Sequence, residues 1–148
     1  MKVSEAMSRD VRIVNPDQTI AEAAQIMAEI DAGSLPVGED DRLVGMLTDR
    51  DIAIRGVAKN CGPDTKIRDV MTTDVKYCYE DEALGHVAKN MGDIQVRRLP
   101  VVNREKRLVG IISLGNIATE GNTRLAADAV RKVSVPGGQH SQSMAGMR

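Results

Sequence analysis

Apolar residues near the start of the chain follow first an extended and then a helical pattern. The run at residues 11–14 predicts a strand. After it, apolar side chains recur three or four positions apart, which is the spacing of one helix face. That face consists of Ile20, Ala23, Met27 and Ile30. Thr19, with Glu22 three residues later, has the pattern of a capping box, so we expect the helix to begin there.

The pattern next predicts two short strands and a further helix. A strand is expected around residues 35–37, a polar turn at 39–41 and a second strand at 43–47. The final helix is expected to open at Thr48. The predicted order of elements is therefore β-α-β-β-α.

The second half of the chain repeats this pattern, with residues 67–121 matching residues 3–56 after one inserted residue. The matching blocks are Met7 with Met71, Asp10-Val11 with Asp74-Val75, Met27 with Met91, Leu35-Pro36-Val37 with Leu99-Pro100-Val101, Arg42-Leu43-Val44-Gly45 with Arg107-Leu108-Val109-Gly110, and Ile52-Ala53 with Ile117-Ala118. The second copy places its elements at an extended run 75–78, a helix face of Leu84, Val87, Met91 and Ile94, a turn at 103–106, a strand at 108–112 and a helix from Ser113. It lacks the capping box, and Gly85 and Gly92 weaken its first helix.

Each copy, at about 55 residues, is too short to bury a large core alone. A small sheet with helices on one face leaves its other face apolar, and the second copy can cover that face. We therefore expect a mixed α/β (α+β) fold in which two β-α-β-β-α repeats pack as a pseudo-twofold pair. The expected parts are repeat 1 at 1–58, a linker at 59–66, repeat 2 at 67–121, an amphipathic C-terminal helix at 122–133 and a disordered tail at 134–148.

Composition argues against several partners. The chain has no Phe or Trp and two Tyr, and its net charge is −1, so it lacks both the stacking platforms and the basic surface that nucleic-acid binding uses. No stretch approaches the roughly 20 apolar residues that span a membrane, and the first ten residues do not resemble a signal peptide. We expect a cytoplasmic protein with neither a nucleic-acid nor a membrane partner.

The reactive side chains do not form a catalytic or metal-binding pattern. Cys61 and Cys78 make no CxxC pair, and His86 and His140 have no second ligand at a helical or hairpin offset. Reduced thiols are the simpler interpretation, and a redox disulfide stays open. Without a Ser-His or Cys-His pairing or a carboxylate cluster, the sequence predicts that the protein is not an enzyme.

The recurring blocks V-x-x-x-M-(S/T)-x-D-V, L-P-V and R-L-V-G-h-h-(S/T) resemble the tandem CBS-domain family, also called Bateman modules, over nearly the whole chain up to Thr119. The segment GMLTDRDIAIRG is also similar to small bacterial stand-alone CBS proteins of the hypoxic-response type. The resemblance implies a regulatory, non-catalytic module that is often dimeric. It also implies a cleft between paired sheets that holds AMP, ADP, ATP or NAD(H), with S-adenosylmethionine less favoured.

The nucleotide motif of the family matches Gly45 to Asp51. At Thr48 a strand turns into a helix, so free N–H groups and the Thr48 hydroxyl could hold a phosphate, and Asp51 could accept from the ribose hydroxyls. The alternative is that Thr48 and Asp51 only form a capping box, which helices use without any ligand. In the second copy Ser113 keeps the hydroxyl, but Asn116 replaces the aspartate and brings no charge.

These differences predict unequal sites, with Asp51 as the ribose anchor and the Ser113 side as the stronger anion pocket. Leu114 and Gly115 remove negative charge there, and Arg97 and Arg98 are phosphate candidates, with ordinary ion pairs as the alternative. The adenine slot would be apolar, formed by Ile13, Leu35 and Pro36 in one cleft and by Tyr77, Leu99 and Pro100 in the other, with ordinary core packing as the alternative. The candidate binding residues are Ile13, Leu35, Pro36, Thr48, Arg50, Asp51, Thr73, Tyr77, Arg98, Leu99, Pro100, Ser113 and Asn116.

Two functions remain open from the sequence. The first is a sensor that binds an adenine nucleotide and passes its output to an unknown effector protein. The second is a dimeric adaptor that binds no ligand. In either case we expect a homodimer, for which Ile52, Ala53 and the helix stripe at 125–133 are candidate contacts, with core packing as the alternative.

Overall fold

The computed structural model describes residues 1–136, and the chain divides into two compact units. The early unit comprises Asp10–Lys76 with Lys106–Leu108, and the late unit comprises Met1–Arg9, Tyr77–Glu105 and the residues from Val109 onward. Most of the tail expected at 134–148 lies outside the described residues. The mixed α+β fold with two repeated halves is confirmed, whereas their pseudo-twofold packing stays a prediction.

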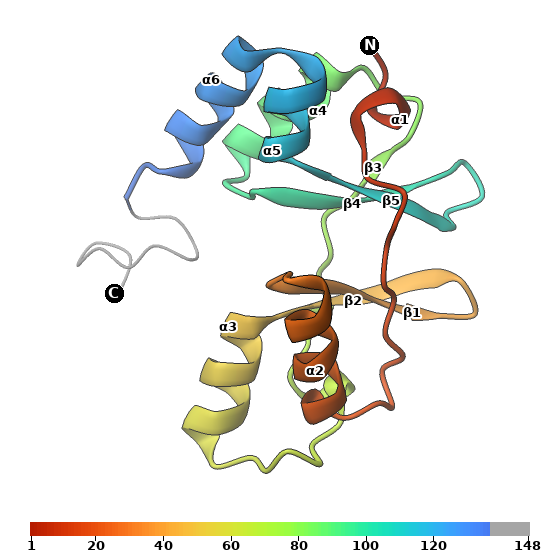
Figure 1. The fold of residues 1–148 in the computed structure, drawn as a ribbon, viewed down its shortest axis with the longest axis vertical. Coiled ribbons are helices and arrows are strands. Elements are labelled where there is room, and N and C mark those ends of the chain that lie inside the picture. The colour runs from red at the N-terminus through yellow and green to blue at the C-terminus, as the bar shows by residue number, and fades with distance from the viewer. Residues whose placement is uncertain (137–148) are drawn as a thin grey trace. The chain divides into compact units, whose positions relative to one another are not determined.

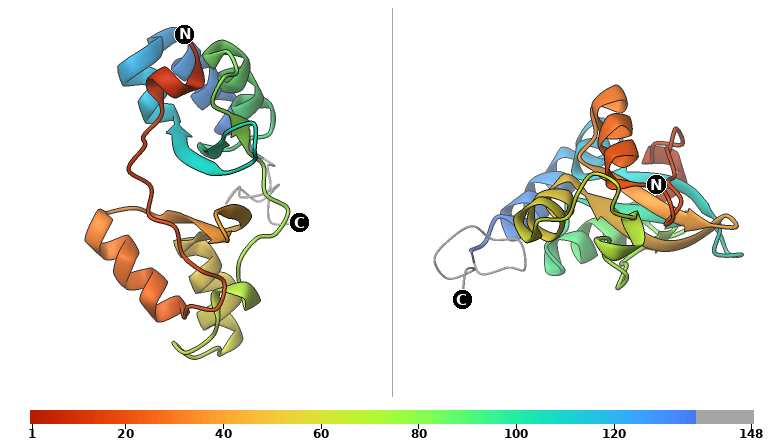
Figure 2. Two further views of the ribbon diagram at one scale, coloured as in Figure 1. Left: turned by 90° about the vertical axis from the view of Figure 1, so that its right-hand side faces the viewer. Right: turned by 90° about the horizontal axis from the view of Figure 1, so that it is seen from below.

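The early unit is a helix, a hairpin and a helical segment (Figure 1, Figure 2). Its elements are α2 (Ile20–Ile30), β1 (Ser34–Glu39), β2 (Arg42–Thr48), α3 (Asp49–Asp51), a π-helix η1 (Ile52–Gly56), and two 3-10 turns, η2 (Val57–Lys59) and η3 (Ile67–Asp69). The predicted start of the first helix is confirmed, since the Thr19 side chain accepts from the Glu22 backbone N–H at 3.1 Å. Glu22 returns the contact by accepting from the Thr19 hydroxyl, at 3.2 Å.

The hairpin of the early unit has the predicted turn. β1 and β2 are antiparallel with Leu35 opposite Leu47, and the turn residues Asp40 and Asp41 have φ values of 54° and 63°, as the tight turns of twisted hairpins require. The strand predicted at 11–14 is reduced to a single parallel bridge between Val14 and Val37. Pro16, two residues later, has no N–H to donate, so the pairing does not continue along the chain.

The late unit repeats this plan with one extra helix (Figure 1). Its elements are α1 (Val3–Ala6), β3 (Cys78–Tyr79), α4 (Leu84–Asp93), β4 (Arg98–Val102), β5 (Leu108–Ser113), α5 (Leu114–Asn116), a π-helix η4 (Ile117–Gly121) and α6 (Thr123–Val133). β3 pairs in parallel with β4, and the sheet order is β3-β4-β5. Of the extended run predicted at 75–78, only Cys78 lies in a strand. α4 begins after Ala83 without a side-chain cap, as the missing capping box predicts.

In each unit, the outer strand of the hairpin pairs with a short segment from the beginning of the other sequence repeat. Ser8 exchanges two backbone hydrogen bonds of 2.9 Å with Ile111 in β5, and Thr72 exchanges bonds of 2.9 and 3.0 Å with Met46 in β2. Residues 1–9, from repeat 1, therefore lie in the late unit, and the start of repeat 2 lies in the early unit. The compact units thus differ in composition from the repeats that the sequence alignment defines.

The exchanged segments pass close to two glycines. A Cβ at Gly45 would lie 2.7 Å from the Met71 sulfur and 3.0 Å from the Thr72 carbonyl oxygen. At Gly110 it would lie 2.7 Å both from the Met7 sulfur and from the Ser8 carbonyl oxygen. The glycine of the R-L-V-G block and the methionine of the M-(S/T) block are therefore two sides of one contact.

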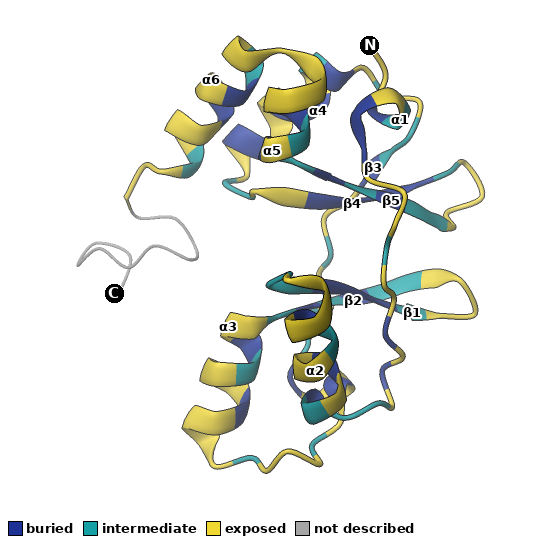
Figure 3. Ribbon diagram, viewed as in Figure 1, coloured by how far each residue is buried: buried dark blue, intermediate teal, exposed yellow. Residues whose placement is uncertain are grey.

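Each unit has its own hydrophobic core between sheet and helices (Figure 3). In the early unit the core combines α2 and the hairpin with Ile67 and Val70 of the exchanged segment, which are 0% and 1% exposed. In the late unit Val3, Ala6 and Met7 make the corresponding contribution. The exchanged segments are thus core elements as well as sheet edges.

The C-terminal helix packs on its own unit. Ala126 and Ala129 of α6 are buried, and Leu125 and Val133 pack partly against the late core. The stripe at 125–133 was a candidate dimer contact, and the alternative reading of core packing is correct for its buried residues. Ile52 likewise packs against the early core, while Ala53 is exposed.

Candidate ligand-binding site

The turn from β2 into α3 forms a complete capping box. The Asp51 N–H donates to the Thr48 hydroxyl at 3.0 Å, and the Thr48 N–H donates to Asp51 Oδ2 at 3.0 Å. Asp51 is the buried charged residue of the described chain, at 7% exposure. Thr48 and Asp51 therefore form the capping box that the sequence analysis gave as the alternative to ligand binding. The box uses one of the two Asp51 carboxylate oxygens.

The other Asp51 oxygen faces an arginine. Asp51 Oδ1 lies 3.8 Å from Arg55 Nε, one helical turn further on. The same guanidinium donates from Nη1 to the Met71 carbonyl oxygen at 3.2 Å. Arg55 was missed by sequence reasoning, because its partner Met71 belongs to the exchanged segment, which the repeat alignment assigns to the other half.

The second copy builds the same turn with an amide. Asn116 Oδ1 accepts from the Ser113 N–H at 3.0 Å and from the Ser113 hydroxyl at 2.9 Å, while the Asn116 N–H donates to that hydroxyl oxygen at 3.0 Å. Leu114 is buried and Gly115 exposed behind this turn. The two units thus share the geometry and differ in the charge that they place there.

The other candidate residues divide between the units. Those in the early unit are Ile13, Leu35, Pro36, Arg50 and Thr73, and those in the late unit are Tyr77, Arg98, Leu99 and Pro100. Leu35 and Leu99 are core residues, at 1% and 4% exposure. Because strand side chains alternate, Pro36 and Pro100 point to the opposite sheet face from these leucines. The leucines therefore pack in the cores of their units, which is the alternative given for them, and their part in an adenine slot stays a prediction.

The remaining candidates are more exposed. Ile13 and Tyr77 are 44% and 41% exposed, and the Tyr77 ring meets Tyr79 edge to face at 5.8 Å. Thr73 and Arg50 are exposed as well. Arg97 and Arg98 are exposed, and within residues 1–136 neither forms an ion pair. These side chains are accessible on the surface of their own units.

The cysteines and the other ionisable groups suggest no further chemistry. Burial, together with the nearby charge of Glu82, raises the pKa of the Cys78 thiol to about 12. Both cysteines are free thiols. In residues 1–136 no three His, Cys, Asp or Glu side chains gather to hold a metal ion. The longest described α-helices have 11 residues, and none of the helices in this part of the chain could cross a membrane.

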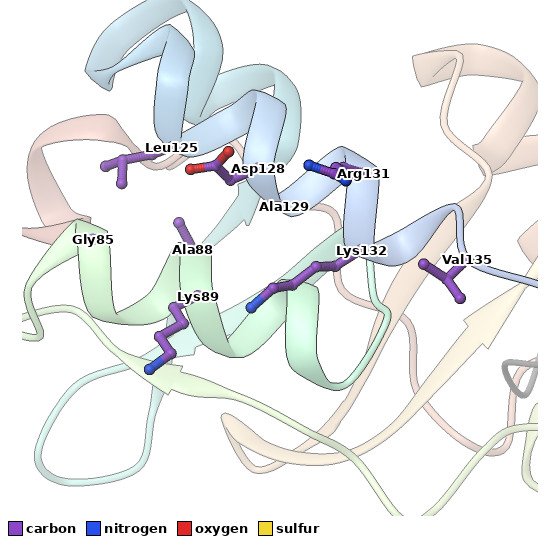
Figure 4. A pocket seen from close by; sticks show the side chains of 9 residues that line it. All are labelled: Gly85, Ala88, Lys89, Leu125, Asp128, Ala129, Arg131, Lys132 and Val135. Atoms are coloured by element: carbon purple, nitrogen blue, oxygen red, sulfur yellow. The ribbon is translucent and has the colours of Figure 1, made fainter.

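A separate pocket of about 510 Å³ lies on the late unit between α4 and α6 (Figure 4). Gly85 and Ala88 of α4 and Ala129 of α6 form its floor, because their small side chains leave space between the helices. Lys89, Asp128, Arg131 and Lys132 are the charged residues that line it. It contains none of the residues that the sequence predicted as a site.

The fold and the repeated strand–turn–helix geometry define a pair of CBS domains. The CBS domain family model matches residues 3–56 and 67–121, and the chain belongs to this family. The Bacillus subtilis protein YhcV, described as CBS domain-containing, is 38% identical over 133 residues, which cover 89% of this chain and 94% of YhcV. Hypoxic response protein 1 of Mycobacterium tuberculosis is 42% identical over 114 residues, covering 76% and 79% of the two chains. The predicted family is thereby confirmed.

Solved structures of CBS proteins have the same fold. The CBS domain pair of protein MJ0100, in complex with 5-methylthioadenosine and S-adenosyl-L-methionine, is 31% identical with a TM-score of 0.71, covering 80% of this chain and 93% of that one. The CBS domain protein PAE2072 of Pyrobaculum aerophilum, complexed with AMP, has a TM-score of 0.75 and covers 86% and 99%. At 23% identity, this second likeness supports the fold alone.

Proposed function

We propose that the protein is a non-catalytic regulatory module that binds an adenosine ligand, with AMP, ADP, ATP or NAD(H) favoured over S-adenosylmethionine. The observation that carries this proposal is the capping box at Thr48–Asp51, where the ligand motif of the family coincides with a buried, charged side chain. The carboxylate uses Oδ2 within the box, and the contact of Oδ1 within the described residues is the longer one to Arg55. A ribose hydroxyl could donate to Oδ1 without breaking the cap.

The two sites are proposed to be unequal. A hydrogen bond to a charged group contributes about 1.5–3 kcal/mol, and a neutral one contributes less. Asp51 would therefore hold ribose more tightly than Asn116, whose Oδ1 already accepts twice from Ser113. The stronger anion pocket at Ser113 also stays a prediction, supported by exposed Gly115 and the exposed Arg97 and Arg98.

We further propose that the module works as a homodimer in the cytoplasm and passes its state to an effector protein. Exposed apolar side chains in the helical segment of the early unit support self-association, namely Ile54 at 49% and Val57 at 67% exposure.

Thermal unfolding with and without millimolar AMP, ADP, ATP, NAD(H) and S-adenosylmethionine tests the ligand. A ligand at about 100 times its Kd adds about 2.7 kcal/mol, which raises the midpoint by several degrees in a chain of this size. The variant Asp51→Asn tests the role of the carboxylate charge. Asn116 occupies the same position in the second capping box, so an amide at residue 51 should keep the cap while removing the charge. We expect the ligand-induced rise to shrink in Asp51→Asn while the midpoint without ligand changes little.

The alternative is a dimeric adaptor without a ligand, and one observation favours it. Both boxes satisfy their own backbone N–H groups, so the turns are complete with nothing bound. Under this alternative none of the nucleotides shifts the midpoint of the wild-type protein, and sedimentation still gives a dimer.

A further inference from the structure

Arg55 connects two segments that both carry candidate ligand-binding residues. Its side chain reaches back one turn from η1 to Asp51 and sideways to the Met71 carbonyl oxygen. Met71 precedes Thr72, which pairs with Met46 on the edge of β2, and Thr73 follows directly. One guanidinium therefore spans the start of the helical segment and the exchanged edge of the same unit.

The arrangement fixes the Asp51 carboxylate from both sides. The Thr48 N–H holds Oδ2 at 3.0 Å, and Arg55 Nε faces Oδ1 at 3.8 Å. The Asp51 side chain is 10% exposed, whereas that of Arg55 is 47% exposed. A carboxylate so shielded from water depends on a nearby cation more than a surface carboxylate does. The length of the contact leaves Oδ1 able to accept a hydrogen bond from another group.

Among residues 1–136, the late unit has no equivalent of this contact. In the repeat alignment Glu120 occupies the position of Arg55 and Asn116 that of Asp51. The early unit thus has an aspartate and an arginine at positions where the late unit has an asparagine and a glutamate. Glu120 is exposed. The two changes are consistent with each other, because an amide needs no counter-charge and glutamate could not supply one.

Resting on the proposed function, we infer that Arg55 is a positioning residue for ribose recognition in the early unit. It orients Asp51 and ties the edge segment at Met71 to the helix, and it does not bind the phosphate itself. The planar guanidinium donates a hydrogen bond to the Met71 carbonyl oxygen and at the same time holds its charge 3.8 Å from Asp51, and a lysine ammonium on a flexible stem cannot reproduce both contacts. Loss of Arg55 should therefore weaken the binding of the nucleoside part of the ligand and leave the contribution of the phosphate unchanged.

The test compares adenosine with AMP by titration calorimetry in wild-type protein, Arg55→Met, Arg55→Lys and Lys59→Met. Arg55→Met is expected to weaken both ligands by the same factor, about tenfold, because the ribose hydrogen bond to a less well oriented Asp51 carboxylate is weakened equally in each case. Arg55→Lys is expected to recover part of the affinity. Lys59→Met removes a cation from the exposed η2 turn that follows η1 and is the matched control, with a change of less than about twofold.

A second measurement needs no ligand. In Arg55→Met the Thr72 N–H, which donates to the Met46 carbonyl oxygen, is expected to exchange its hydrogen faster than in wild-type protein or Lys59→Met, because Met71 is no longer held. Unchanged exchange and unchanged affinity in Arg55→Met overturn the inference. A loss confined to AMP also overturns it, because it would make Arg55 a phosphate ligand. If the wild-type protein binds neither adenosine nor AMP and no other adenine nucleotide shifts its thermal midpoint, the proposed function is overturned and the role of Arg55 with it, before any variant is compared. A different nucleotide that does shift the midpoint takes the place of AMP in the comparison.

Discussion

Gly45 and Gly110 lie where the backbone of an exchanged segment passes too close for a side chain. The sequence repeat shows that both positions are glycine, but the repeat alone gives no reason for it. The reason is the methionine sulfur, which would lie 2.7 Å from an added Cβ at either position. At residue scale, the repeated glycine and the repeated methionine thus specify one packing contact, made once in each unit.

We expect Gly45→Ala to lower the free energy of unfolding by about 1–3 kcal/mol, because the added methyl group overpacks a filled site. Urea unfolding followed by circular dichroism measures the change. Gly62→Ala is the control, since a Cβ there meets nothing within 4 Å. Adding Met71→Ala to Gly45→Ala should recover part of the loss. An equal effect of the two glycine substitutions would contradict the packing explanation.

Cys78 and Cys61 should differ in reactivity toward a thiol reagent at pH 8. The pKa of Cys78 is raised to about 12, so almost none of the reactive thiolate is present, while Cys61 is partly exposed. One thiol should react in the folded protein and two after unfolding. Fast reaction of both thiols in the folded protein would show that Cys78 is accessible.

The same shift predicts how stability depends on pH. The folded state holds the Cys78 proton more tightly than the unfolded state, whose thiol has the ordinary pKa of 9.0. Cys78 therefore has no effect on the free energy of unfolding below about pH 9 and lowers it as the pH rises from 9 toward 12. Urea unfolding across this range should show a shallower fall in Cys78→Ala than in wild-type protein.

At the scale of elements, the two main helices begin differently, and this gives a pair of changes with opposite sign. Thr19→Ala removes the side-chain cap of α2 and should lower the free energy of unfolding by about 1 kcal/mol. Ala83→Ser adds a cap to α4, whose N-cap residue already has extended φ and ψ, and should raise the free energy of unfolding by about 0.5–1 kcal/mol. Urea unfolding measures both. Unchanged stability in Thr19→Ala would mean that the cap does not stabilise α2, and a loss of stability in Ala83→Ser would mean that a missing cap does not limit α4.

The local pattern was sufficient to predict most of the elements and could not predict their partners. The cap at Thr19, the hairpin turns and the amphipathic stripe of α6 are set by residues close in sequence. The run at 11–14 was overestimated, because alternating apolar residues indicate which side chains face inward but not how many backbone groups find a partner. Arg55 was missed for a related reason, since its contact to Met71 joins residues that the repeat places in different copies.

At the scale of the molecule, the compact units and the sequence repeats have different boundaries. Ile67 and Val70 are fully buried in the early core, although they begin repeat 2. Repeats are detected by similarity along the chain, which does not show that the copies exchange their first residues. The one signal in the sequence was that each repeat carries both the glycine of the R-L-V-G block and the methionine of the M-(S/T) block, which contact each other across the two repeats.

Two fragments test this composition. Residues 10–76 keep the edge at Thr72 and the buried Ile67 and Val70, whereas residues 1–66 have the first repeat without them. We expect the first fragment to unfold cooperatively in urea and the second to lose that cooperativity, because it leaves part of the core open. Equal cooperativity in the two fragments would mean that the exchanged segment is dispensable.

The bridge between Ser8 and Ile111 also bears on how the protein is made. Residues 1–9 are synthesised about a hundred residues before the strand that they border, which is complete only after residue 113 has been added. The early unit has almost all of its chain by residue 76 and can fold while synthesis continues. The segment at residues 1–9, with Val3, Ala6 and Met7 still without their core, waits until the late unit has been synthesised, so it reaches its final place after the early unit that follows it in the chain.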